Sequence, residues 1–302
     1  MSIKSKIESG QALVLVLLSL AVVLTLVLFI LSRSVTDISV SSKNSEAITA
    51  FSAAEAGIEQ ALVIGTGGSS TLSNSASFTS SVASFNTVGG SSFNYPIELS
   101  SGDSATTWFV AHDASTSAVV CDGARPCFTG NNFKVCWGKP GTASDAVVTP
   151  AIEATVFYEA TPGDLSTVKI ARAAFDPNSG RRSSNSLSAP DAGSCTIDGQ
   201  NYAFQKTATF SGLGVPAGSY GVQDGLQFVR FRMIYNTDTT QTLGTTVSFA
   251  GEFLPSQGQK IVSTGSAGGT AGANRRIEVF QGWPEVPSVF DTSVFSSTGL
   301  TK

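Results

Sequence analysis

Apolar and polar positions divide the chain sharply near its N-terminus. Residues 12–31 carry no charge, and Ser19 and Thr25 are the polar members of this run. A helix rises about 1.5 Å per residue, so a run of this length spans roughly 30 Å, the thickness of the hydrocarbon layer of a bilayer. A cleaved export signal has a shorter apolar core, followed directly by a small-x-small cut site. The sequence LSRSVTD follows instead, so the pattern predicts a transmembrane helix.

The helical pattern continues beyond the apolar run. Gly57 is the single glycine between residue 11 and residue 64, and no proline occurs in this stretch. Apolar side chains recur at one helical spacing, at Ile48, Phe51, Ile58 and Leu62. We therefore expect one helix over 11–64, with a transmembrane half over 12–31 and an amphipathic half over 32–64. Such a helix would pack first in lipid and then against protein.

The remainder of the chain has the composition of turns and strands. Residues 65–105 are dominated by Gly, Ser, Thr and Asn, which predicts a loosely ordered loop region. Runs rich in β-branched and aromatic residues then follow, separated by Gly, Pro, Asn and Asp clusters. These runs are 106–111, 151–160, 168–175, 202–210, 226–235, 246–254 and 275–281. We predict an α+β protein, in which the long helix is followed by a β-rich, mostly antiparallel head over residues 106–302.

The run LQFVRFRMIY, residues 226–235, shows how such a strand would divide its side chains. Alternate residues of a strand point to opposite faces of the sheet. One face would carry an apolar set, Val229, Phe231, Met233 and Tyr235. The other face would carry Arg230 and Arg232, so we expect that face to be solvated.

Charge and motif content limit the possible functions. The net charge is −4 and charged residues make up 13% of the chain, which argues against nucleic acid as a partner because phosphates require clustered cations. The single histidine, His112, has no neighbouring ligand or nucleophile motif, and the sequence contains no HExxH, GxSxG or CxxC. We therefore expect no enzyme, no cofactor and no metal. Asp176, Asn178 and Gly180 in DPNSG favour a turn over a calcium loop.

The four cysteines all lie in the predicted head, and an even number favours disulfides in an oxidising compartment. A turn at residues 131–132 would place Cys127 opposite Cys136 and leave Cys121 to pair with Cys195, which is the pairing that we prefer. The alternative joins Cys121 to Cys127 and Cys136 to Cys195. A zinc site is a third option, disfavoured because no tight CxxC pair is present.

The N-terminal features together resemble those of the type IV pilins. A short polar leader and a glycine precede an uninterrupted apolar helix that runs into an amphipathic one. The sequence GQALVLVLL with the later FSAAEAGI is similar to PilX-type minor pilins and to the related pseudopilins of type II secretion. The resemblance implies that a prepilin peptidase removes residues 1–10 by cutting between Gly10 and Gln11, and that the new amine of Gln11 is methylated. A glycine at the cut leaves the peptidase room to reach the backbone.

Leu15 departs from the pattern of most fibre-building pilins, which carry Glu at this fifth position of the mature chain. In the family this Glu attracts the N-terminal amine of a neighbouring subunit within the bilayer, where a paired charge costs less than a lone one. The absence of the carboxylate implies a position at the tip or start of a fibre.

These observations lead us to expect a structural subunit of a type IV pilus, namely a minor or tip-initiating pilin. Its partners would be other pilin subunits through the helix, the prepilin peptidase, the pilus assembly platform and the membrane. Lys4 and Lys6 precede the apolar run and Arg33 follows it, which places the N-terminus in the cytoplasm and the head outside. The protein would move from the cytoplasmic membrane to an extracellular pilus. The alternatives are a membrane-anchored adhesin or binding head, and a type II secretion pseudopilin.

Overall fold

The computed structural model describes residues 9–85, 90–247, 253–269, 272–285 and 287, with side chains from Leu13 onward. The chain forms two compact units. The helical unit comprises residues 1–81 and 262–278, and the head unit comprises residues 82–261 and 279–302. Together they contain a long apolar helix followed by antiparallel β-sheets, so the predicted α+β class is confirmed.

Helix α1 (Ser9–Ile64) is continuous over 56 residues, and its end agrees with the expectation from sequence. In its Ser- and Thr-rich middle, two threonine hydroxyl groups bond to carbonyls one turn earlier in the helix. Thr36 Oγ1 donates to the Ser32 carbonyl at 2.9 Å, and Thr49 Oγ1 donates to an equivalent carbonyl one turn earlier. Gly65 ends the helix: it adopts φ +77°, and its N–H bonds the Ala61 carbonyl at 2.8 Å.

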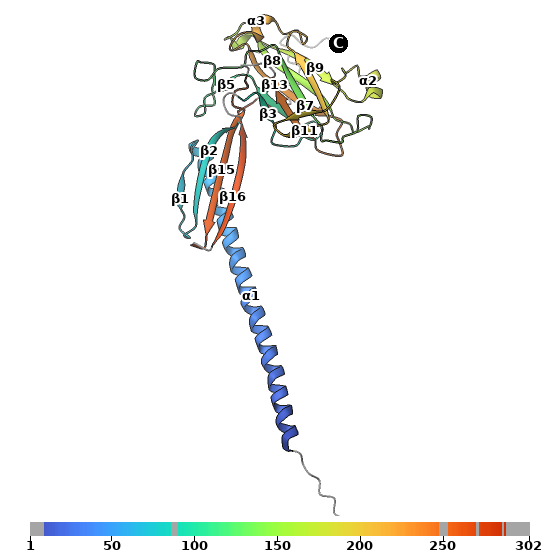
Figure 1. Cartoon of the computed structure of the whole chain (residues 1–302). Helices are drawn as coiled ribbons and strands as arrows, with labels where there is room; N and C mark the ends of the chain where they lie inside the picture. The colour runs from blue at the N-terminus through green and yellow to red at the C-terminus, as the bar shows by residue number, and fades with distance from the viewer. Residues whose placement is uncertain (1–8, 86–89, 248–252, 270–271, 286, 288–302) are drawn as a thin grey trace, which may run out of the picture. The chain divides into compact units, whose positions relative to one another are not determined.

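A four-stranded sheet lies along the last part of α1 in the helical unit (Figure 1). Its strands, in spatial order, are β1 (Ser69–Thr71), β2 (Ser77–Phe85), β15 (Gly258–Ala267) and β16 (Ala273–Gly282). A small apolar core joins the helix to the sheet and includes Ala50, Ala53, Ala76, Phe78 and Ala267. The predicted loop region 65–105 is therefore wrong where β1 and β2 lie. In β2, Phe78 and Ser80 are buried while Thr79 and Ser81 are exposed, which is the alternation of a strand with one packed face.

Within the described residues, the head unit contains two further four-stranded sheets, both antiparallel. The first consists of β4 (Ser104–Trp108), β13 (Leu226–Ile234), β8 (Ala151–Glu159) and β9 (Val168–Phe175), in that order. The second consists of β12 (Phe204–Thr209), β7 (Asn132–Trp137), β14 (Leu243–Thr246) and β3 (Ser92–Asn94). Shorter elements are β5 (Ala111–His112) with β6 (Val119–Val120), β10 (Cys195–Ile197) with β11 (Gln200–Tyr202), η1 (Leu165–Thr167), α2 (Ser179–Asn185) and α3 (Ala217–Tyr220).

The strand expected over 246–254 can be compared with the structure only at its ends, because residues 248–252 lie outside the described residues. β14 ends at Thr246. Beyond it, Val247 is only 2% exposed, and its N–H donates to the Ser91 carbonyl at 2.8 Å, next to the pairing of Thr246 with Ser92 of β3.

Strand β13 confirms one half of its predicted pattern and corrects the other. Val229, Phe231 and Met233 are fully buried, as alternation predicts, and Arg232 is exposed. Arg230, however, is only 2% exposed, with its guanidinium near the rings of Phe157 and Phe228. Glu285 provides the opposite charge. The expected solvated face is therefore covered at Arg230, because aromatic neighbours and a paired carboxylate make burial of the charge tolerable.

Candidate functional site

The apolar half of α1 is the most unusual surface of the described chain. Every large apolar side chain from Leu13 to Leu31 is between 46% and 67% exposed. An 18-residue stretch of this helix has a mean hydropathy of 3.3, and none of it is buried in the structure. By length and composition the helix could cross a membrane. Exposed apolar surface costs roughly 25 cal/mol per Å² in water. The segment therefore requires lipid or protein around it.

Polar side chains within this segment do not interrupt its apolar character. Ser19 Oγ donates to the Val16 carbonyl at 2.9 Å, and Thr25 Oγ1 donates to the Val22 carbonyl at 2.8 Å. Both hydroxyl groups are thereby satisfied within the helix, as a hydrocarbon environment demands. Leu15 is 61% exposed on the same surface. The position that the resemblance to pilins singled out thus presents an apolar side chain.

Gly10 and Gln11, the predicted cleavage positions, lie in the first turns of α1. The predicted leader lies outside the described residues except for its last two positions, Ser9 and Gly10. The backbone at the proposed cut is helical, and cleavage there remains a prediction.

The later part of α1 packs through its smallest residues. Ala50, Ala53 and Ala54 are fully buried, whereas Ile48 and Phe51 are 60% and 46% exposed. A Cβ atom added to Gly265 of β15 would lie 2.0 Å from the Ala50 carbonyl oxygen. The strand approaches the helix backbone so closely that only small side chains fit. Of the expected apolar stripe, Ile58 is buried, while Ile48, Phe51 and Leu62 remain exposed and enlarge the uncovered apolar surface.

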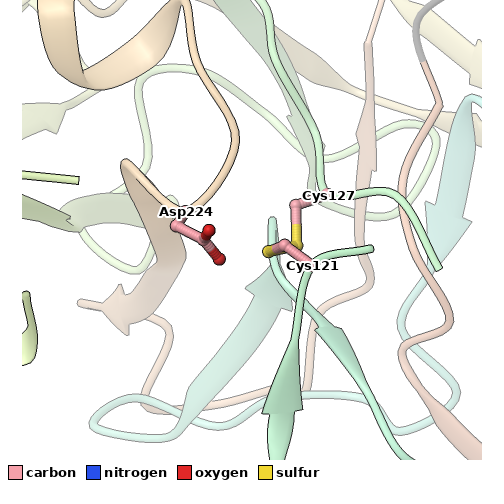
Figure 2. Close-up of side chains that lie close together, drawn as sticks. All are labelled: Cys121, Cys127 and Asp224. Atoms are coloured by element: carbon pink, nitrogen blue, oxygen red, sulfur yellow. A yellow bond between two sulfur atoms is a disulfide. The ribbon is translucent and has the colours of Figure 1, made fainter. Parts of the chain in front are cut away.

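The disulfides follow the alternative pairing, and the preferred pairing is wrong. Cys121 bonds Cys127, and Cys136 bonds Cys195. The expected hairpin between residues 127 and 136 does not exist, because β7 pairs instead with β12 and β14, placing Cys136 opposite Gln205 and Gly244. Figure 2 shows the first disulfide beside the carboxylate of Asp224.

The two disulfides are expected to contribute unequally to stability. Cys136–Cys195 has a sequence separation of 59 and Cys121–Cys127 one of 6. Loop-closure entropy assigns about 4 kcal/mol to the first and about 2 kcal/mol to the second. Denaturant unfolding of Cys136→Ala/Cys195→Ala and of Cys121→Ala/Cys127→Ala should therefore show the larger loss of unfolding free energy in the first pair. An equal or reversed order would contradict this expectation.

His112 lies in an aromatic setting rather than beside a reaction partner. Its ring stacks on Trp283 at 5.0 Å between centroids and meets the edge of Trp108 at 4.5 Å. Burial lowers the pKa of His112 to about 4, against a weaker opposing effect of the Val110 carbonyl, so the imidazole is neutral at pH 7. It lines a cavity of about 310 Å³ together with Asp113. The carboxylate of Asp113 is already bonded by its own turn and by Arg125, which leaves it little capacity for a ligand.

Asp176 and Asn178, from the DPNSG sequence, form a structural cluster at the start of α2. The Asn178 side chain caps the helix by accepting from Arg181 N–H at 3.0 Å. Asp176 is fully buried and is bonded by the Arg181 guanidinium at 2.7 and 2.8 Å. These contacts occupy the side-chain oxygens that a calcium loop would require.

Comparisons with known proteins give no identification. No protein-family model matches the chain, and no curated protein or solved structure shows significant similarity to it. The architecture, a long apolar N-terminal helix followed by a β-rich head, is consistent with that of type IV pilins.

Proposed function

We propose that this protein is a structural subunit of a type IV pilus, a minor pilin of the PilX type that occupies the tip or start of the fibre. The observation that carries the proposal is helix α1, whose apolar half is exposed on all sides while its later half packs on a sheet through Ala and Gly. An ordinary single-pass anchor requires no continuous helix beyond the membrane. A subunit that transfers its helix from lipid into a bundle of similar helices does.

The exposed surface supports such a transfer. The apolar half would exchange lipid for neighbouring helices, so that its side chains stay out of water throughout assembly. Ile48, Phe51 and Leu62 continue this apolar surface beyond the membrane and would contact adjacent subunits. Leu15 offers no carboxylate to the N-terminal amine of a neighbour. This fits a subunit at the tip or start of the fibre better than one within its shaft.

The state of the N-terminus in cells tests the proposal directly. Mass spectrometry of the protein from membranes and from sheared surface fibres should find a chain that begins at Gln11, with a methylated amine. Gly10→Val should leave the leader in place and remove the protein from the fibre fraction, because the peptidase can no longer reach the backbone. Ser5→Ala, a substitution within the leader, serves as the matched control. An intact leader in the protein without substitutions would refute the proposal.

The remaining alternatives give different cellular results. A membrane-anchored adhesin or binding head would reach the surface uncut and independently of a pilus assembly motor. A type II secretion pseudopilin would be cut, but its deletion would block protein export and leave pili in place. Loss of pili on deletion, with export unaffected, supports the pilus subunit.

A further inference from the structure

Three metal-ligating side chains of the head unit converge at one point. The Sγ atoms of Cys121 and Cys127 and a carboxylate oxygen of Asp224 all lie within 4.8 Å of one another. Cys121 directly follows β6, and a single residue, Gly225, separates Asp224 from β13. Figure 2 shows the carboxylate turned toward the two sulfur atoms. Residues far apart in the sequence therefore meet at this place.

Asp224 is an unusual neighbour for a disulfide. It is half-buried, and its side chain has no hydrogen-bond or ion-pair partner in the described chain. Its backbone adopts φ +64°, in the left-handed region that non-glycine residues seldom occupy. A partly desolvated carboxylate without a counter-charge gains free energy from a nearby cation. The disulfide sulfurs supply no such charge.

The two cysteines are held near each other by contacts that do not depend on the disulfide. Asp122 and Arg125 exchange backbone hydrogen bonds at 3.1 and 3.2 Å within the intervening loop, and Asp122 Oδ1 accepts from Arg125 N–H at 2.7 Å. Gln223 bonds both the N–H and the carbonyl of Cys127, at 2.7 and 3.0 Å. Gln223 adjoins Asp224, so the segment that carries the carboxylate stays attached to Cys127 when the sulfurs separate.

We propose that, when the Cys121–Cys127 disulfide is reduced, Cys121, Cys127 and Asp224 bind one Zn²⁺ ion. Reduction by a phosphine transfers two electrons to the disulfide: the S–S bond breaks, the phosphine becomes its oxide with oxygen from water, and the two water protons form two thiols. Zinc binding then releases both thiol protons and forms two Zn–S bonds and one Zn–O bond. Water would complete the tetrahedron, as at zinc sites with three protein ligands.

The two Sγ atoms and the carboxylate oxygen need only small movements to reach the distances of tetrahedral zinc coordination. Zn–S bonds of about 2.3 Å and Zn–O bonds of about 2.0–2.2 Å place tetrahedral ligand atoms roughly 3.5–3.8 Å apart. The sulfurs must therefore move apart to reach this spacing, while a carboxylate oxygen already lies within 4.8 Å of both of them. Thiolates favour zinc over calcium or magnesium, which prefer oxygen ligands. The pair Cys136–Cys195 belongs to no such three-ligand group in the described residues, so it provides an internal comparison.

Zinc titration of the full-length chain in detergent tests the inference. The protein is reduced, freed of reductant under anaerobic conditions and titrated with Zn²⁺ against a chromophoric chelator, while Co²⁺ charge-transfer absorption reports thiolate ligation. We expect one zinc ion per reduced chain and none bound by thiolates in the oxidised chain. Cys121→Ser/Cys127→Ser should abolish binding. Asp224→Asn should weaken it at least about tenfold, since loss of even an outer-shell partner costs 10–100-fold.

Controls separate the site from general effects. Asp238→Asn removes a carboxylate of the head unit that belongs to no such cluster, and it should leave zinc affinity unchanged. Circular dichroism of each oxidised variant verifies folding before reduction. The inference is overturned if the reduced chain binds no zinc, if Asp224→Asn binds as tightly as the parent chain, or if Cys136 and Cys195 supply the thiolates. None of these outcomes bears on the pilin proposal, which depends on helix α1.

Discussion

Replacing Gly265 with alanine is expected to separate helix α1 from its sheet and to lower the unfolding free energy by about 3 kcal/mol or more. The new Cβ atom would lie 2.0 Å from the Ala50 carbonyl oxygen and 2.4 Å from the Ala54 nitrogen. Both are backbone atoms of a continuous helix, so no side-chain rotation relieves the overlap. The strand or the helix must move, and the packing of the surrounding alanines is lost with it.

Hydrogen exchange and denaturant unfolding measure this effect. In Gly265→Ala, amide protection should fall over residues 50–61 of α1 and over β15. Gly123→Ala is the matched control, because its Cβ would meet no atom within 4 Å and its backbone φ is ordinary. It should unfold like the parent chain. Unchanged protection in Gly265→Ala would show that the helix and strand are not in the close contact described.

The helix could be predicted from sequence because its signals are local. A long stretch with one glycine and no proline, followed by Gly65, determines both its continuity and its end. Which face packs could not be predicted in the same way. Hydrophobicity favours Ile48 and Phe51, but the contact depends on Gly265, which lies about two hundred residues later in the chain. That the face around Ala50 packs can be recognised only when α1 and β15 are placed next to each other.

Non-local pairing also explains the errors in the head unit. Strands β8, β9 and β13 are rich in β-branched and aromatic residues and lie where predicted. The cysteine pairing depended on a local hairpin, whereas the actual position of Cys136 is determined by β7 lying between two strands that follow it much later in sequence. The meeting of Asp224 with Cys121 and Cys127 is equally non-local. No spacing rule in the sequence signals it.

Removing the charge of Asp176 is the second substitution with a large expected effect. Its carboxylate is fully buried and pairs with Arg181, whose guanidinium also donates to the Val147 and Thr149 carbonyls and lies 3.9 Å from the centre of the Tyr235 ring. Asp176→Asn would leave this cation partly buried without its counter-charge and place amide protons against guanidinium protons. Breaking a buried pair in this way costs about 3–5 kcal/mol.

The ion pair can be distinguished from simple packing by a double-mutant cycle. Arg181→Met alone should also be strongly destabilising, because it leaves the Asp176 carboxylate buried and unpaired. The double variant Asp176→Asn/Arg181→Met should lose less than the sum of the two single losses, as for any pair in direct contact. Lys139→Met removes an exposed ion pair with Glu98, whose side chain is 47% exposed, and should lower the unfolding free energy far less than either single variant of the buried pair. Additive losses in the cycle would contradict direct coupling.

The same carboxylate predicts how stability depends on pH. Burial alone would raise the pKa of Asp176, but hydrogen bonds from Arg181, the Asn178 N–H and Asn185 outweigh it and hold the pKa below its ordinary value of 3.8. A folded-state pKa below the unfolded one gives stability that is complete above the unfolded value and is lost as pH falls through the folded one. Unfolding free energies measured from pH 6 downward should therefore decline in acid, and the decline should be shallower in Asp176→Asn, which has no proton to bind at this position. Parallel curves for the two proteins would show that Asp176 does not contribute to the acid sensitivity.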